Sequence, residues 1–206
     1  MIIEVRTYQL KPGSVPEVEK RFAECLPARE KLSKLTALWH TEIGPLNEIT
    51  HVWTYDSFEQ RMAIRGEAVK SGVWPPPIAE FIVTMQSEIF LPAPFSPALT
   101  PREVGPLFEI RSYTMAPGAM PGTIERWSAK IDERVKLSPL VGAWYTELGG
   151  LNKWVHIWAY KDVAERQRIR AEAVARGIWP PAGGAPGQLV RQENKLVLPA
   201  SCSPLR

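Results

Sequence analysis

The sequence has few of the residue types that mark specialised classes of protein. Among its 206 residues are two cysteines, Cys25 and Cys202, and three histidines. So few cysteines argue against a disulfide framework and favour a reducing cytoplasm. Because no pair of histidines or cysteines has the spacing of metal ligands, we expect neither a metal nor another cofactor.

The chain also lacks blocks of like charge and long apolar runs. Its 25 basic and 22 acidic residues are mixed along the sequence, so no segment resembles a phosphate-binding surface, and we expect no nucleic-acid partner. The start of the chain has no basic region followed by an apolar stretch, and four prolines interrupt the uncharged run from Ile89 to Pro101. We therefore expect no signal peptide, no membrane span and a cytoplasmic location.

The chain contains two copies of one segment, and the second begins 105 positions after the first. Such a repeat indicates two structural units of the same fold. The residues of the first copy that recur 105 positions later include Glu4, Arg6, Tyr8, Trp39, Thr41, Glu42, Gly44, Leu46, Asn47, His51, Trp53, Tyr55, Arg61, Arg65 and Trp74.

A proline-rich segment separates the two copies. Five prolines lie between Leu91 and Leu107, and this density is typical of a stiff, extended linker. We therefore divide the chain into a first module over 1–95, a linker over 96–107 and a second module over 108–206.

The first half of each module is predicted to be a strand followed by a helix. Residues 2–10 alternate between apolar and polar side chains and end in a turn, which indicates a strand. Ser14 is placed to cap the following helix, in which apolar residues recur at helical spacing. Pro27 is expected to kink that helix.

The second half of each module is predicted to be a hairpin, a helix and a last strand. Residues 36–43 and 49–56 form the hairpin, whose Asn47 supplies turn geometry. The helix begins at the capping residue Ser57 and ends at Gly72, and residues 80–90 form the last strand. The resulting order, βαββαβ, is that of a ferredoxin-like module.

Side chains alternate across a strand, so each predicted strand has two faces. One face is apolar and includes Ile3, Val5, Trp39 and Val52, and we expect the helices to cover it. The polar and aromatic face of the first copy carries Glu4, Arg6, Tyr8, His40, Glu42, His51, Trp53 and Tyr55. Its counterpart in the second copy carries Glu109, Arg111, Tyr113, Tyr145, Glu147, His156, Trp158 and Tyr160.

An aromatic face of this size is rarely left in water. We therefore predict that the two copies cover each other with these faces. The predicted fold is α+β: two ferredoxin-like βαββαβ modules in tandem that form a pseudo-dimeric α+β barrel with the helices outside.

The spaced pattern of the repeat resembles a NIPSNAP domain. The pattern reads Trp39-x-Thr41-Glu42-x-Gly44-x-Leu46-Asn47, then His51-x-Trp53-x-Tyr55, Arg61, Arg65 and Trp74-Pro75. Both copies carry it, so the resemblance covers most of the chain except the linker and the last residues. The resemblance implies a dimeric α+β barrel, made here by two fused domains. It implies little chemistry, because the family has no generally assigned reaction and relatives in the wider fold group include cofactor-free monooxygenases, isomerases and haem-handling proteins.

Two histidines are the candidates for proton transfer. His51 and His156 occupy equivalent positions beside tryptophan and tyrosine, and an imidazole can act as an acid or base near neutral pH. The alternative is a histidine that is hydrogen-bonded inside a core. His40 is a weaker candidate, because the second copy has Tyr145 in its place.

Candidate ligand-binding residues surround these histidines. An arginine can bind a carboxylate or enolate oxygen, although a buried ion pair explains the same residues. Aromatic rings can stack on a planar ligand, although they also fill cores. The candidates are Arg6, Tyr8, Glu42, Trp53, Tyr55, Arg111, Tyr113, Glu147, Trp158 and Tyr160.

Two classes of function stay open. The first is a small-molecule-binding protein or a cofactor-independent enzyme that acts on a planar apolar ligand, in the barrel cavity or between the sheet and the helices. The second is a non-catalytic scaffold or regulatory module that binds another protein. A third, weaker option is haem handling with His51 as an axial ligand. Association of tandem chains into a homo-oligomer also stays open.

Overall fold

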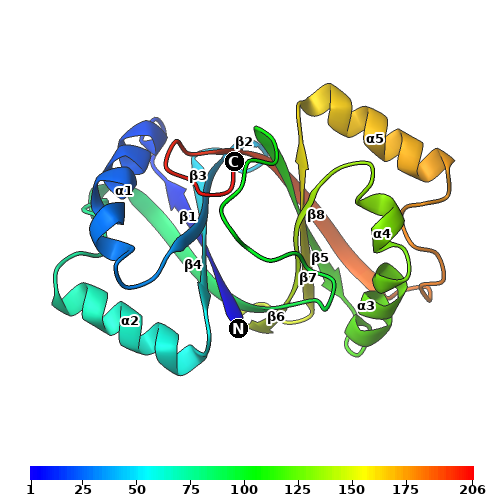
Figure 1. The fold of residues 1–206 in the computed structure, drawn as a ribbon, viewed down its shortest axis with the longest axis horizontal. Coiled ribbons are helices and arrows are strands. Elements are labelled where there is room, and N and C mark those ends of the chain that lie inside the picture. Colours follow the sequence, from blue (N-terminus) through cyan, green and yellow to red (C-terminus); the bar gives the residue numbers. More distant parts are fainter.

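Eight strands close into a barrel in the computed structural model, which describes residues 1–206 (Figure 1). The strands are β1 (Ile2–Leu10), β2 (Leu35–Ile43), β3 (Glu48–Tyr55), β4 (Ile82–Pro92), β5 (Leu107–Met115), β6 (Leu140–Leu148), β7 (Lys153–Tyr160) and β8 (Leu189–Pro199). Their order around the barrel is β1-β3-β2-β8-β5-β7-β6-β4. The predicted α+β barrel of two tandem modules is confirmed.

The helices lie outside the barrel on two opposite sides, with α1 and α2 on one side and α3, α4 and α5 on the other (Figure 1). Their bounds are α1 (Val15–Arg29), α2 (Phe58–Lys70), α3 (Met120–Ser128), α4 (Ile131–Arg134) and α5 (Val163–Ala175), and a 3-10 turn, η1, spans Ala79–Phe81. The helix α1 passes through Pro27 and ends two residues later. No helix is both long enough and apolar enough to cross a membrane.

Local signals in the sequence explain several boundaries. The Ser57 side chain accepts a hydrogen bond from the Gln60 backbone N–H at 3.2 Å, as a helix cap does. Asn47 and Asn152 turn the two hairpins with φ of 56° and 58°, a region that asparagine tolerates. Ser14 was expected to cap α1 with its side chain but does not, because its hydroxyl donates to the Lys11 carbonyl.

The last strand of each module pairs with strands of both modules. The strand β4 pairs with β1 and then, over Ile89–Pro92, with β6 of the second module. In the same way β8 pairs with β5 and, at its end, with β2 of the first module. The barrel therefore closes only when both modules are folded together.

The linker and the C-terminal tail meet over the barrel. Arg102 and Leu205 form a parallel bridge, and in Figure 1 the C-terminus lies beside the linker. Leu205 is fully buried in the apolar cluster of the barrel, and Leu99 and Val104 pack against that cluster. These segments thus extend the barrel core.

The two faces of the sheet are arranged opposite to the sequence prediction. The apolar face points into the barrel, where Ile3, Trp39 and Val52 join Phe108 and Trp144 of the second module in one cluster. The polar and aromatic face lies under the helices, as shown by the cluster that joins Tyr8, Trp53 and Tyr55 to Val18 and Phe22 of α1. The charged groups gain partners in this arrangement, because the helices carry the arginines that pair with them.

The barrel interior is a packed core. A cavity of about 60 Å³ lies in it beside Trp39, Phe90 and Trp144, and a polar pocket of about 480 Å³ opens at the barrel rim beside Thr7 and Ser112. Ligand pockets for small molecules usually measure about 300–1,000 Å³. The cavity among Trp39, Phe90 and Trp144 is smaller than this range, and a site for a planar ligand inside the barrel stays a prediction.

The two repeated histidines lie in the layer between sheet and helices. His51 and His156 are each 1% exposed, and their Nδ1 atoms accept hydrogen bonds from the indole N–H groups of Trp53 and Trp158 at 2.7 Å. Because an indole N–H only donates, Nδ1 carries no proton and a neutral ring holds its proton on Nε2. The ring of His51 also packs edge-on against Tyr8, with 4.8 Å between centroids.

Burial keeps both imidazoles neutral. It lowers the pKa of His51 to about 3, with a further contribution from the charge of Arg6. Burial and the charge of Arg111 likewise lower the pKa of His156 well below its usual range. At neutral pH both rings are uncharged.

We expect the protein to lose stability as the pH falls below about 6.5, the usual pKa of an unfolded histidine. In this range the unfolded chain binds protons that buried His51 and His156 do not, so the free energy of unfolding decreases by up to about 1.4 kcal/mol per pH unit for each histidine. Urea unfolding of the wild type between about pH 7 and pH 5 should show this slope. The His51→Gln/His156→Gln variant should show a much smaller one.

The comparison of slopes isolates the two buried rings. His40, whose pKa is raised by its hydrogen bond to Glu19, is present in both proteins and its effect cancels. Equal slopes in the wild type and the double variant would show that the buried histidines do not control the pH dependence.

Candidate functional site

A buried carboxylate lies at the centre of the helix-facing side of the second module. Glu109 on β5 is fully buried, and its oxygens contact Arg111 of the same strand at 2.7 Å, Arg166 of α5 at 2.5 Å and Arg170 of α5 at 3.6 Å. Burial alone would raise the pKa of Glu109, but the hydrogen bond from Arg166 and the charges of Arg111 and Arg170 lower it. The carboxylate thus stays charged and fastens α5 to the sheet.

The first module repeats this arrangement. Glu4 is fully buried and contacts Arg6 at 2.8 Å and Arg61 of α2 at 2.6 Å, while Ser87 donates a hydrogen bond at 2.7 Å. Burial would raise the pKa of Glu4, but these partners outweigh it and lower the value to about 2. Arg6 thus forms the buried ion pair that was the alternative to a ligand contact, with Glu4 as its partner, whereas Glu42 is exposed.

A further buried arginine adds positive charge beside Glu109. Arg134 of α4 is 2% exposed and donates to the hydroxyls of Ser138 at 2.9 Å and Tyr160 at 3.3 Å, with no carboxylate in contact. Its guanidinium lies 4.0 Å from the centre of the Trp158 ring. Burial lowers the pKa of Arg134, and the charge of Arg170 acts in the same direction.

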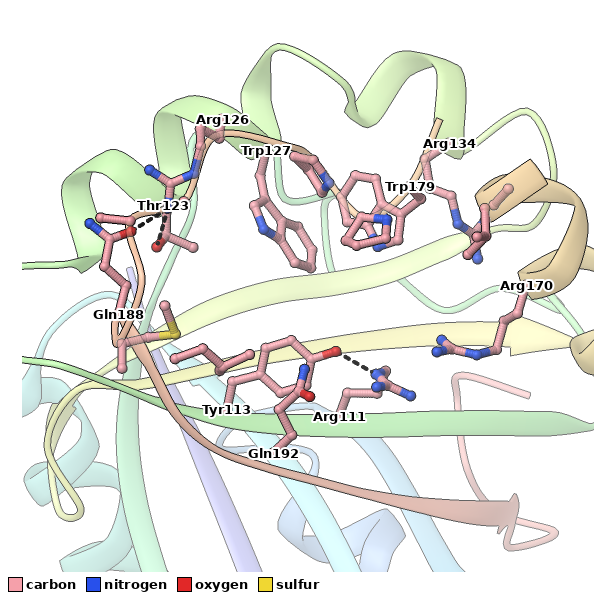
Figure 2. Close-up of a pocket in the computed structure, with 18 residues that line it drawn as sticks. Arg111, Tyr113, Thr123, Arg126, Trp127, Arg134, Arg170, Trp179, Gln188 and Gln192 are labelled. Carbon is pink, nitrogen blue, oxygen red and sulfur yellow. Dashed lines mark hydrogen bonds between the residues drawn. The ribbon is translucent and has the colours of Figure 1, made fainter. Parts of the chain in front are cut away.

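A cavity of about 570 Å³ opens next to this cluster, between the sheet and the helices of the second module (Figure 2). Aromatic side chains form its walls: Trp127 of α3 and Trp179 meet edge to face at 4.3 Å, and Tyr113 of β5 lies across from them. Four arginines line the cavity, namely Arg111, Arg126, Arg134 and Arg170, and no acidic residue does.

The arginines occupy the two ends of the cavity. Arg111, Arg134 and Arg170 lie at one end, and Arg126 lies at the other (Figure 2). Arg126 donates hydrogen bonds to Gln188 at 3.0 Å and to Thr123, both uncharged. The cavity therefore has an aromatic middle between two cationic ends.

The corresponding arginine of the first module is neutralised by acidic residues. Arg21, which corresponds to Arg126, contacts Glu17 at 2.8 Å and Glu80 at 2.7 Å and also donates to the Pro77 carbonyl. Ile78 is 3% exposed and belongs to the apolar cluster of that module. The two modules thus differ in charge at this place.

A loop of different length accompanies this difference. Leu10 faces Ile82 across the first module, and Met115 faces Leu189 across the second. The offset between copies has therefore grown from 105 to 107, so the loop after Trp179 is two residues longer than its counterpart. This loop contains Gly183, Gly184 and Gly187, and parts of it line the cavity.

The structure brings together some of the predicted site residues. Arg111 and Tyr113 line the cavity, joined by a 2.7 Å hydrogen bond from Nε to the phenol. Trp158 and Tyr160 both contact Arg134, and Glu147 is exposed at a strand end.

In the first module, Arg6, Tyr8, Trp53 and Tyr55 occupy the equivalent places under the helices. His156 packs against Tyr113 and Trp127 behind the cavity wall and does not line the cavity. A catalytic role for His51 or His156 stays a prediction.

Sequence reasoning missed the residues that give the cavity its character. Arg126, Arg134, Trp127 and Trp179 come from helices and a loop, about which the alternation along strands gives no information. Two signals were available in the sequence. Arg29 recurs as Arg134 at the repeat offset, and the glycines after Trp179 reveal a longer loop.

Comparison with known proteins agrees with the repeat and the fold. The NIPSNAP family model matches residues 3–97 and 108–204. The chain is 29% identical over 213 residues to Protein NipSnap homolog 3A of Homo sapiens, covering 98% of this chain and 85% of that protein. It is 39% identical over 84 residues to Protein NipSnap homolog of Dictyostelium discoideum, covering 41% of this chain and 38% of that protein.

Among solved structures, a putative monooxygenase from Lactobacillus acidophilus NCFM superposes with a TM-score of 0.66, covering 97% of this chain and 94% of that chain. At 8% identity this likeness shows a shared fold alone. The family assignment rests on the NIPSNAP match, which occurs once in each module and spans nearly the whole sequence. The chain belongs to the NIPSNAP family.

Proposed function

We propose that this NIPSNAP protein binds a small organic anion with an aromatic body in the cavity between the sheet and the helices of its second module. The observation that carries this proposal is a lining with four arginines and no acidic residue. The proposal keeps the small-molecule function expected from the sequence. It places the ligand between the sheet and the helices, one of the two expected locations, and gives it a negative charge.

The charge balance of the site supports an anion. Glu109 is the one carboxylate in contact with Arg111, Arg166 and Arg170, and Arg134 has none. Guanidinium groups bind carboxylates through paired, charge-assisted hydrogen bonds. An anion at this end of the cavity would offset a surplus of positive charge that the protein leaves in place.

Two of these arginines have donors to spare. Arg111 uses Nε for Tyr113 and Nη1 for Glu109, which leaves Nη2 for a ligand. The Arg170 side chain is 37% exposed, and its contact with Glu109 is a long 3.6 Å. Both groups can therefore bind a carboxylate without breaking the buried cluster.

The walls of the cavity favour a flat ring. Trp127, Trp179 and Tyr113 offer ring edges and faces, and aromatic pairs of this kind contribute about 0.5–1.5 kcal/mol beyond simple burial. The volume of about 570 Å³ lies within the usual range for small-molecule sites. The same donors would also stabilise an enolate, so cofactor-independent catalysis is chemically compatible with this site.

The scaffold alternative is compatible with the apolar cluster that fills the middle of the barrel. It also requires an apolar groove on the outside. The cavity in the second module is lined by arginines and glutamines as well as by aromatic rings, which favours a charged small molecule.

A charge series of one ring system tests the proposal. 2-Naphthoate should bind at least about tenfold more tightly than 2-naphthamide, because the amide has the same shape but cannot form charge-assisted hydrogen bonds. Tryptophan fluorescence and calorimetry would report binding, since Trp127 and Trp179 line the site. Equal affinity for the two compounds, or binding of neither, would contradict the proposal.

A matched pair of variants tests the location. Arg170→Gln should weaken 2-naphthoate binding about tenfold, because it removes one charged hydrogen-bond donor from the cavity. Arg65→Gln changes the equivalent residue of the first module and should leave the affinity unchanged. Calorimetric titration of both variants would decide, and an equal loss in both would place the site elsewhere.

A further inference from the structure

Two ion pairs lie at the rim of the barrel where β3 and β7 begin. Glu48 contacts Lys195 at 2.5 Å, and Glu88 contacts Lys153 at 2.6 Å. Each pair joins a strand of one module to a strand of the other, at the seams where β8 meets β2 and β4 meets β6. These contacts therefore belong to the interface through which the modules recognise each other.

The four residues occupy two equivalent positions of the repeat. Glu48 corresponds to Lys153 at the offset of 105. Glu88 corresponds to Lys195, because Glu88 faces Val5 on β1 and Lys195 faces Ile110 on β5. The first module thus carries an acid at both positions, and the second module carries a lysine at both.

This distribution makes the rim selective for unlike modules. Glu48 and Lys153 occupy one repeated position, and Glu88 and Lys195 occupy another. At each seam, the residue at the first position in one module contacts the residue at the second position in the other module. A barrel made from two first modules would bring Glu48 of one chain against Glu88 of another at both seams. A barrel made from two second modules would oppose Lys153 and Lys195.

The surroundings strengthen the selection. The side chains of the two pairs are between 13% and 32% exposed, so water screens their charges only in part. Lys195 also donates to Thr50 at 2.8 Å, and Glu88 accepts from the Gly150 backbone at 3.1 Å. These contacts fix the charged groups where a like charge would have to approach.

The backbone pairing at the seams does not distinguish like from unlike modules. The seams are held by backbone hydrogen bonds, which are the same for any sequence. The barrel interior has Trp39 and Trp144 at one repeated position and Val52 and Ile157 at another, but Ile3 is replaced by Phe108 and Phe90 by Val197, so packing differs in part between the modules.

We propose that the ion pairs Glu48–Lys195 and Glu88–Lys153 direct each module to close its barrel with the unlike module and reject the like module of a second chain. Opposed like charges at both seams disfavour the wrong partner. The sequence thereby prevents tandem chains from exchanging modules into barrels of two first or two second modules.

One double variant removes the selection against like modules and keeps an ion pair at each seam. In Glu48→Lys/Lys195→Glu, each seam still has one acid and one lysine, but each module now also carries one of each. Barrels of like modules then have attractive seams as well. The fourfold reversal, Glu48→Lys/Glu88→Lys/Lys153→Glu/Lys195→Glu, restores the selection with opposite signs and serves as the matched control.

The experiment refolds the full-length proteins from denaturant at high concentration, because the linker otherwise favours closure within one chain. Gel filtration with light scattering then measures the fraction of two-chain species. The double variant should give a several-fold larger fraction than the wild type and the fourfold reversal. Exchange that keeps unlike modules together is equally available to all three proteins, so only pairing of like modules can raise the fraction.

Thermal unfolding supplies the second readout. The double variant should keep a melting temperature close to that of the wild type, because both ion pairs persist within its chain. Glu48→Lys/Glu88→Lys, which places lysines on both sides of each seam, should melt lower. Equal two-chain fractions in the double variant, the wild type and the fourfold reversal would overturn the proposal, as would an unchanged melting temperature of Glu48→Lys/Glu88→Lys.

Discussion

The helix layer of each module depends on a fully buried carboxylate, Glu4 or Glu109, and on the arginines around it. A buried charge is tolerated only when it is paired, and removing one partner of such a pair costs about 3–5 kcal/mol. The pairing fixes a helix to the sheet, since Arg61 comes from α2 and Arg166 comes from α5. It also explains the orientation of the sheet, because the charged face must lie where the helices can supply guanidinium groups.

The need to pair the buried carboxylate also explains the positive charge at the cavity of the second module. The arginines that contact Glu109 carry more positive charge than one carboxylate can neutralise. Arg134 adds another cation that contacts no acidic residue. In the first module, Glu17 and Glu80 neutralise Arg21 at the outer end of the corresponding region. In the second module, Arg126 has only uncharged partners and the loop above it is longer. The two copies thus share one architecture but differ in charge around Arg21 and Arg126.

Much of the architecture could be predicted from the sequence, because repeats, turns and helix caps are local signals. The hairpins at Asn47 and Asn152 and the helix start at Ser57 are examples. The direction of the sheet faces could not be predicted in this way. Alternation separates the set of Glu4, Arg6 and Tyr8 from the set of Ile3 and Val5, but it does not say which set faces the barrel. That choice depends on arginines from helices far along the chain, and the cavity depends further on the side chains of α3, α4 and a loop.

The location of the ligand is the central claim and can be observed directly. A crystal of the protein soaked with 4-iodobenzoate would reveal the iodine by its anomalous scattering. We expect an iodine peak among Trp127, Trp179 and Tyr113, with the carboxylate density at Arg111 and Arg170. A peak inside the barrel between Trp39 and Trp144, or equal peaks under the helices of both modules, would contradict it.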